Sequence, residues 1–327
     1  MVWDLEKEFD RIGTNSIKWE FVVEEGALIE WDRTHASHGD DRVLPLWVAD
    51  MDFPAAPPIQ AAIRKRAEHG VFGYASKGKR YLSAVAGWMQ RRHGFLVEQE
   101  LTVPTPRVVA GLHLCVRRFT EPGDKILIQP PVYHPFRYSI ERNQRVVAAN
   151  PLILDNGRYQ MDFEQLERTC QDPEVKLAIL CSPHNPVGRV WTAGELTRFA
   201  EICTRHDVLV MADEIHGDLI MPGHKFVSYG TLDNSLTENV IVGTAPSKSF
   251  NLAGLQTANL IIRNQTLREE LRAEMAATDI FTVNPFGIVA TEAAYNEGES
   301  WLAAVISHID ANLDLLEAYV SEGIFHS

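Results

Sequence analysis

Short apolar runs rich in Val, Ile and Leu recur along the chain, and segments with helical spacing separate them. The runs do not alternate with polar residues, which is typical of strands buried on both faces. The pattern therefore predicts an α/β fold with a mainly parallel sheet covered by helices. The expected strands are 125–128, 145–147, 177–180, 208–211, 240–242 and 258–262. The expected helices are 57–69, 80–93, 133–142, 163–169, 193–206, 285–297 and 301–320, and a loop leads into a further helix within 105–119.

The two ends of the chain differ from this middle part. Residues 1–45 are polar and predict an N-terminal arm, and the run LPLWVADMDFP at 44–54 predicts a strand that ends in two aspartates. A length of 327 residues favours one large domain and a smaller one. We expect the large domain at 46–285 and the start of a small C-terminal domain at 286–327.

Composition excludes several classes of protein. Hydrophobic residues make up 45% and charged residues 23%, as in soluble globular proteins, and the net charge of −13 argues against nucleic-acid or anionic-membrane binding. The four cysteines form no C-x-x-C pair, no metal-binding spacing is present, and the N-terminus lacks an apolar signal region. These features predict a cytoplasmic protein with reduced thiols.

Polar clusters follow three of the expected strands. They are Ser182–Gly188, Asp213–His216 and the loop that carries Lys248. Because parallel sheets place ligands beyond the carboxyl ends of their strands, Asn185, Asp213 and Lys248 should converge on one edge. A lysine beside apolar walls is partly desolvated, which makes it a candidate for Schiff-base chemistry.

Two nucleotide-binding patterns compete with this interpretation. The run GYASKGK at 73–79 resembles a phosphate loop, but Arg80 stands where Ser or Thr binds magnesium, and a helix precedes the run. VLVMADEIH resembles the acidic box of a helicase, but the chain is acidic and lacks a working phosphate loop. Neither pattern is favoured.

Several motifs carry a resemblance to a known family. SPHNPVGR, ADEIH and SKSFNLAGLQ, in this order, resemble fold-type I pyridoxal-phosphate (PLP) enzymes of the class I/II aminotransferase superfamily. LPLWVADMDFP, VFGYAS, EPGDKILIQPPVYHPF and NPVGRVW are similar to its cystathionine β-lyase branch, the MalY/PatB-type C–S lyases. The resemblance implies a three-layer PLP-transferase fold and PLP as the cofactor.

The resemblance also implies roles for individual residues. Lys248 would bind PLP covalently and move protons, and Asp213 would keep the ring nitrogen protonated. Asn185 would bond the phenolic oxygen, and Tyr133 would stack on the ring; a helix cap, a turn residue and a core aromatic are the respective structural alternatives. The further implied cofactor contacts are Val109, Ala110, Gly111, Thr244, Ser247 and His216, together with Tyr74 from the neighbouring subunit of a homodimer.

The sequence departs from the family pattern at three places. Gln256 stands eight positions after Lys248, where aminotransferases have an arginine, and His216 replaces a common tyrosine. No arginine follows Arg272, so we expect the clamp for the substrate carboxylate to be missing and the small domain to be incomplete. Apolar positions near the end, Leu313, Leu316 and Val320, should then lack partners.

The resemblance implies a C–S β-lyase that cleaves cystathionine or cysteine S-conjugates to a thiol, pyruvate and ammonia. Its expected partner is a small amino-acid substrate. An aminotransferase is the alternative within enzymes. A PLP-binding pseudoenzyme with an interaction role is the alternative outside them, because the clamp arginine is missing.

Overall fold

The computed structural model describes residues 3–24, 27–30, 45–281 and 283–321, and the chain divides into two compact units, Met1–Ala55 and Ala56–Ser327. The domain boundaries expected from the sequence stay a prediction. No helix in the described ranges combines the length and the apolar composition needed to cross a membrane.

The first unit contains a short helix and a hairpin, α1 (Ile17–Glu20), β1 (Phe21–Glu24) and β2 (Ala27–Glu30). The strand expected at 44–54 is wrong for 45–54, and Leu44 lies outside the described residues. Asp50 and Asp52 instead bind the guanidinium of Arg11, at 2.7 and 2.8 Å. The Lys18 ammonium lies 2.6 Å from Asp52 as well, so ion pairs hold this segment in place of a strand partner.

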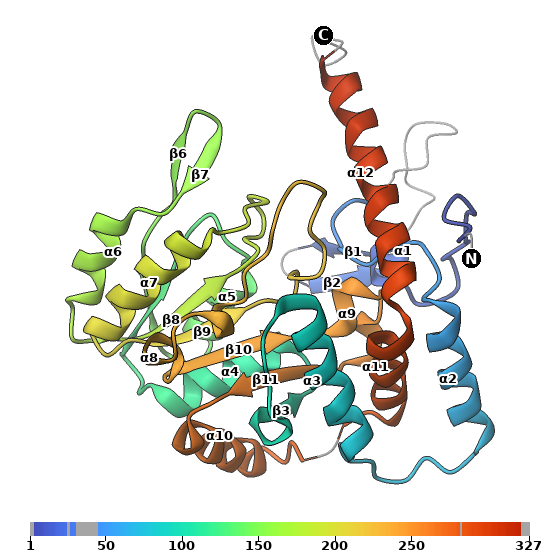
Figure 1. The fold of residues 1–327 in the computed structure, drawn as a ribbon, viewed down its shortest axis with the longest axis horizontal. Helices are drawn as coiled ribbons and strands as arrows, with labels where there is room; N and C mark the ends of the chain where they lie inside the picture. Colours follow the sequence, from blue (N-terminus) through green and yellow to red (C-terminus); the bar gives the residue numbers. More distant parts are fainter. Residues whose placement is uncertain (1–2, 25–26, 31–44, 282, 322–327) are drawn as a thin grey trace. The chain divides into compact units, whose positions relative to one another are not determined.

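The second unit is built on a seven-stranded sheet (Figure 1). Its order is β3 (Thr102–Thr105), β11 (Ala258–Ile262), β10 (Val240–Thr244), β9 (Leu209–Asp213), β8 (Val175–Cys181), β4 (Lys125–Ile128) and β5 (Val146–Ala149). β11 runs antiparallel to both of its neighbours, and the strands from β10 to β5 are parallel. The predicted mainly parallel α/β fold is confirmed. A separate hairpin joins β6 (Ile153–Asp155) to β7 (Arg158–Gln160).

Most of the expected helices are present within a few residues of their predicted bounds. The helices are α2 (Pro57–Glu68), α3 (Lys79–His93), α4 (Val108–Phe119), α5 (Pro135–Glu141), α6 (Phe163–Cys170), α7 (Ala193–Arg205), α8 (Asn234–Thr237), α9 (Pro246–Ser249), α10 (Gln265–Ala277), α11 (Pro285–Glu297) and α12 (Glu299–Ser321). The sequence pattern did not predict α10 or the edge strand β3. Local chemistry fixes some ends: α7 begins with a capping box in which Thr192 and Glu195 each bond the other's backbone N–H.

Helices lie on both faces of the sheet. Leu112 of α4, Ile140 of α5 and Leu271 of α10 share one core with alternate strand residues such as Ile179, Met211 and Leu260. Successive residues of a strand point to opposite faces, so Asn259 points the other way. On that second face the Tyr81 hydroxyl of α3 donates to the Asn259 side chain over 2.7 Å. Three layers result.

Among the described residues, the buried side chains of the last helix, α12, all lie in its first half. Trp301, Leu302, Val305 and Ile306 are buried, whereas every residue from 311 to 321 is exposed. Leu313, Leu316 and Val320 are 41%, 55% and 53% exposed, so the described chain leaves these apolar side chains largely uncovered. In Figure 1 this part of α12 extends away from the sheet.

Candidate active site

The carboxyl ends of three parallel strands lie side by side in the sheet. Cys181 at the end of β8 pairs with Asp213 at the end of β9, and Asp213 pairs with Gly243 of β10. Asn185 follows β8 after four residues, and Lys248 lies on α9, directly after β10. The structure therefore brings the three polar clusters noted in the sequence to one edge. β10 extends to Thr244, two residues beyond its predicted end.

Asp213 is a buried carboxyl group at the centre of this edge. Burial raises its pKa to about 6, although the hydrogen bond from the Ile215 N–H and the positive charge of Lys248 act in the opposite direction. The Ile215 bond goes to Oδ1, at 3.1 Å. A ligand N–H placed against Asp213 would stabilise the ionised form.

Lys248 lies on a helix of only four residues, and its side chain is half-buried. Its charge acts on His216 as well as on Asp213. Burial, aided by the Lys248 charge, lowers the pKa of His216 to about 4, so its imidazole is neutral at pH 7. Lys248, Asp213 and His216 therefore belong to one electrostatic group.

Tyr133 and Asn185 join the same edge from the β4 and β8 sides. The Tyr133 backbone N–H donates to the Asn185 carbonyl over 3.0 Å. Burial raises the pKa of the Tyr133 phenol, and the nearby Asp213 carboxylate raises it further. The Asn185 side-chain amide makes no hydrogen bond to the part of the chain that the structure describes, so it can donate to a ligand.

The N-terminus of α4 supplies backbone donors. Its cap residue, Arg107, makes no side-chain capping bond, and the first N–H groups of a helix have no partner within it. The N–H groups of Val108, Val109 and Ala110 can thus bind an anion. The prediction that Gly111 is also a donor is wrong for this structure, because its N–H already donates to the Arg107 carbonyl.

A glycine lets this helix end approach the sheet. A Cβ added to Gly243 would lie 2.9 Å from Cγ1 of Val108 and 2.8 Å from Cε of Met211, closer than side chains pack. A residue with a Cβ at position 243 would force Val108 or Met211 to shift. The close approach places the free N–H groups of α4 next to the strand that leads to Lys248.

The remaining predicted contacts are placed as follows. Thr244 is buried at the end of β10, and Ser247 is half-buried beside Lys248. Gln256 is exposed with a left-handed φ of 48°. Tyr74 is 95% exposed in the loop before α3, where its ring lies 6.5 Å from that of Phe281. At this exposure Tyr74 is not one of the buried side chains around Asp213.

This set of groups fits PLP. A buried carboxylate suits a pyridine N–H, and a free amide suits a phenolic oxygen. An uncapped helix N-terminus suits a phosphate, and a half-buried amine suits an aldehyde. Each of these partners lies at the same sheet edge.

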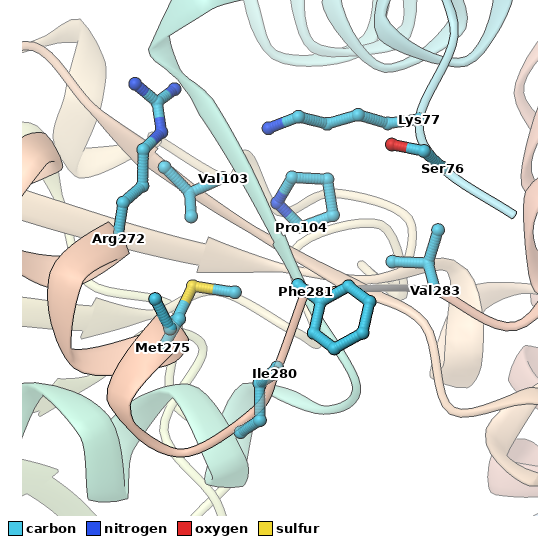
Figure 2. Close-up of a pocket in the computed structure, with 10 residues that line it drawn as sticks. Ser76, Lys77, Val103, Pro104, Arg272, Met275, Ile280, Phe281 and Val283 are labelled. Atoms are coloured by element: carbon cyan, nitrogen blue, oxygen red, sulfur yellow. The ribbon is translucent and has the colours of Figure 1, made fainter. Parts of the chain in front are cut away.

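A cavity of about 380 Å³ lies elsewhere, between the loop before α3, strand β3 and helix α10 (Figure 2). Lys77 and Arg272 face it across apolar walls. Burial, with the charge of Arg272, lowers the pKa of Lys77 to about 8. Both cations donate to backbone carbonyls, Lys77 to Thr102 and Arg272 to Glu100. None of the residues predicted to bind the cofactor lines this cavity.

The sequence pattern missed a buried acid close to the site. Asp218 follows Asp213 by five residues, and its carboxylate accepts a hydrogen bond from Ser249, the residue after Lys248. Its signal in the sequence is faint, because a single aspartate in a loop usually caps a turn or faces solvent. Only its burial reveals it.

Comparisons with known proteins agree with this geometry. The sequence model described as "Aminotransferase class I and II" matches residues 42–321. Cystathionine beta-lyase PatB of Bacillus subtilis is 41% identical over 318 residues, which cover 97% of this chain and 79% of PatB. The crystal structure of cystalysin from Treponema denticola, which contains a pyridoxal 5'-phosphate cofactor, matches with a TM-score of 0.91 and 34% identity over 100% of this chain and 80% of that one.

A PLP-bound C–S lyase from Staphylococcus hominis matches with a TM-score of 0.86 and 31% identity, over 100% of this chain and 79% of that one. The family model spans most of the sequence, and its matched segment contains every residue of the sheet edge described above. The chain therefore belongs to the aminotransferase class I and II family.

Proposed function

We propose that this chain is a PLP-dependent C–S β-lyase, which cleaves cystathionine or a cysteine S-conjugate to a thiol, pyruvate and ammonia. The observation that carries the proposal is the convergence of Lys248, Asp213 and Asn185 at the ends of adjacent parallel strands. The similarity to relatives named as cystathionine β-lyases and C–S lyases supports the reaction class.

The cofactor site is assigned by chemistry. Lys248 would hold PLP through its amine, and the Asp213 carboxylate would accept a hydrogen bond from the ring nitrogen. Asn185 would donate to the phenolic oxygen, and the ring of Tyr133 would pack against the cofactor. The α4 N–H groups would bind the phosphate with the hydroxyls of Ser247 and Thr244.

When bound, PLP supplies an electron sink that stabilises negative charge at the substrate α-carbon. The Lys248 amine would take the substrate α-proton at Nζ as general base. Asp213 would keep a positive charge on the ring nitrogen of PLP. His216, neutral at pH 7, adds no competing cation beside Lys248.

The chain is proposed to act as a homodimer in the cytoplasm. Phe72, Tyr74 and Phe281 are 59%, 95% and 64% exposed, and exposed apolar groups of this kind favour an interface. Tyr74 would then complete the phosphate site of the partner subunit. All four cysteines are free and buried, which fits a reducing compartment.

One experiment tests both cofactor and reaction. The purified protein loaded with PLP is reduced with borohydride, and the labelled peptide is identified. We expect the label on Lys248 and its absence from Lys248→Ala. Lys77 is the matched control, since burial and the charge of Arg272 lower the pKa of its amine to about 8, and a label on Lys77 in the wild-type protein would overturn the assignment.

The reaction is then assayed with cystathionine. We expect pyruvate and thiol in equal amounts without an added keto acid. An aminotransferase is the second candidate, because the family model carries that name. Amino-group transfer that depends on a keto acid, without pyruvate release, would establish it instead.

A further inference from the structure

A buried carboxyl group, Asp218, joins three segments next to the turn that carries Lys248. Its Oδ2 accepts from the Ser249 hydroxyl over 2.6 Å, and its Oδ1 lies 2.7 Å from Nε2 of His93. The Trp88 indole N–H donates to the same carboxylate, at 3.1 Å from Oδ1. Asp218 thereby links the loop after β9, the end of α3 and the helix α9.

This carboxylate is sealed from solvent. Asp218 is 4% exposed, Trp88 1% and Ser249 0%. A buried carboxylate is costly unless donors surround it; here Ser249 and Trp88 donate to it, and Nε2 of His93 lies within hydrogen-bond distance. Asp218 stands between Ser249 and His93, which do not bond each other, so the group is not the relay of a serine hydrolase. Its contacts instead hold α9 against α3.

The helix that Asp218 anchors cannot hold its own orientation. α9 contains only Pro246–Ser249, and its cap residue Ala245 provides no side-chain bond. A single helical turn has few internal hydrogen bonds, so contacts from outside must fix it. The hydrogen bond from Ser249 to Asp218 is such a contact, and it lies one residue from Lys248.

Aromatic packing against α3 also holds Phe250, the residue after Ser249. The ring of Phe250 lies 5.5 Å from that of Trp88, in an edge-on arrangement. Trp88 in turn stacks on Tyr295 at 5.2 Å, with 9° between the rings. Trp88 therefore both donates to Asp218 and packs against Phe250, in the segment after Lys248.

We propose that Asp218, acting through Ser249, is a positioning residue that sets the direction in which Lys248 presents its amine to the cofactor. The inference rests on the proposed role of Lys248. Asp218 touches neither the substrate nor the cofactor. Loss of its bond to Ser249 should loosen the lysine turn and leave the other anchors of the carboxylate, Trp88 and His93, in place.

The test is Ser249→Ala, with Ser139→Ala as the matched control. Ser139 is equally buried, and its hydroxyl makes a bond of 2.7 Å to the Phe136 carbonyl on α5, away from the lysine turn. Three quantities are measured on each protein: the melting temperature without PLP, the dissociation constant for PLP, and the visible circular dichroism per bound PLP. The last two report how the amine and the ring are held.

We expect Ser249→Ala to weaken PLP binding about tenfold and to reduce the dichroism per bound PLP, beyond the effect of any fall in melting temperature that the loss of one donor to Asp218 causes. Ser139→Ala should keep the dichroism of the wild type. Equal PLP affinity and dichroism in the two variants would overturn the proposal. The proposal would also be overturned if the fall in the melting temperature of Ser249→Ala were large enough to explain its weaker PLP binding.

A second variant tests whether the effect of Ser249→Ala depends on Asp218. If the effect passes through Asp218, adding Ser249→Ala to Asp218→Asn should change PLP affinity less than it does in the wild type. Full additivity would contradict the route, and if Asp218→Asn does not fold, Ser249→Ala alone decides. Borohydride labelling of the wild type keeps the outcomes separate: a label away from Lys248 refutes the proposed function, whereas a label on Lys248 with an unaffected Ser249→Ala refutes only this inference.

Discussion

At the scale of single residues, Asp213 carries an energetic conflict. The cofactor-free protein buries a carboxyl group whose pKa is raised from 3.8 to about 6, chiefly by loss of solvation. An acid with a raised pKa contributes its full stability below the unfolded pKa and loses it as the pH rises through the folded one. Above pH 6 the free protein therefore holds a disfavoured charge that a bound N–H would relieve.

This conflict predicts that Asp213→Asn increases the free energy of unfolding of the cofactor-free protein, and does so more at high pH than at low pH. The difference between 3.8 and about 6 corresponds to about 3 kcal/mol at pH 8, and to less at pH 5. Asparagine retains an acceptor for the Ile215 N–H but carries no charge. Urea unfolding of the cofactor-free proteins at both pH values measures the gain. A stability difference that is the same at pH 5 and pH 8 would contradict it.

The same substitution should harm the chemistry. Without a carboxylate, the ring nitrogen of PLP loses its partner, and exchange of the substrate α-hydrogen in deuterated water should fall by about 100-fold or more. Glu214→Gln is the control, since Glu214 is also buried but bonds Ser228 and the Tyr229 N–H instead. Unchanged exchange in Asp213→Asn would show that the nitrogen is held by another group.

At the scale of secondary-structure elements, the contact between α4 and β10 decides where the helix N–H groups lie. We predict that Gly243→Ala destabilises the protein by about 1–3 kcal/mol, because the new methyl group would press on Val108 and Met211. It should also weaken PLP binding by shifting the start of α4.

Chemical unfolding and PLP titration measure both effects. The control is Gly194→Ala in α7, where an added Cβ meets nothing within 4 Å, and where alanine should be neutral or stabilise by about 0.5–1 kcal/mol. Equal stability of the two alanine variants would mean that the contact between helix and strand can relax.

At the scale of the whole molecule, the exposed Tyr74 predicts a shared site. A Lys248→Ala chain mixed with a Tyr74→Phe chain should form hybrid dimers in which one site has an intact lysine and an intact tyrosine from the other chain. We expect each variant alone to be inactive or strongly impaired, and the mixture to recover up to about a quarter of wild-type activity, set by random pairing and one intact site per hybrid. Mass spectrometry of the dimers confirms exchange. No recovery in mixtures that contain hybrids would place Tyr74 outside the partner's site.

The sequence by itself predicted six of the seven strands of the sheet and proposed the main residues of the candidate site. Strands such as 177–180 and 258–262 are short and mostly apolar without alternation, which favours burial on both faces of a sheet. Lys248, Asp213 and Asn185 lie at or shortly after the ends of three such strands. Because neighbouring parallel strands end at one edge, the order of these residues along the chain already implied that they meet.

Only the tertiary structure decided the features that depend on contacts distant in the sequence. The run at 44–54 looks like a strand, but Arg11 and Lys18 bind its two aspartates and hold it without a strand partner. Asp218 looks like a loop residue until Trp88, His93 and Ser249 surround it. In both cases the partners lie 30 or more positions away. Local propensity carries no information about such pairs, because their energy arises only after the chain has folded.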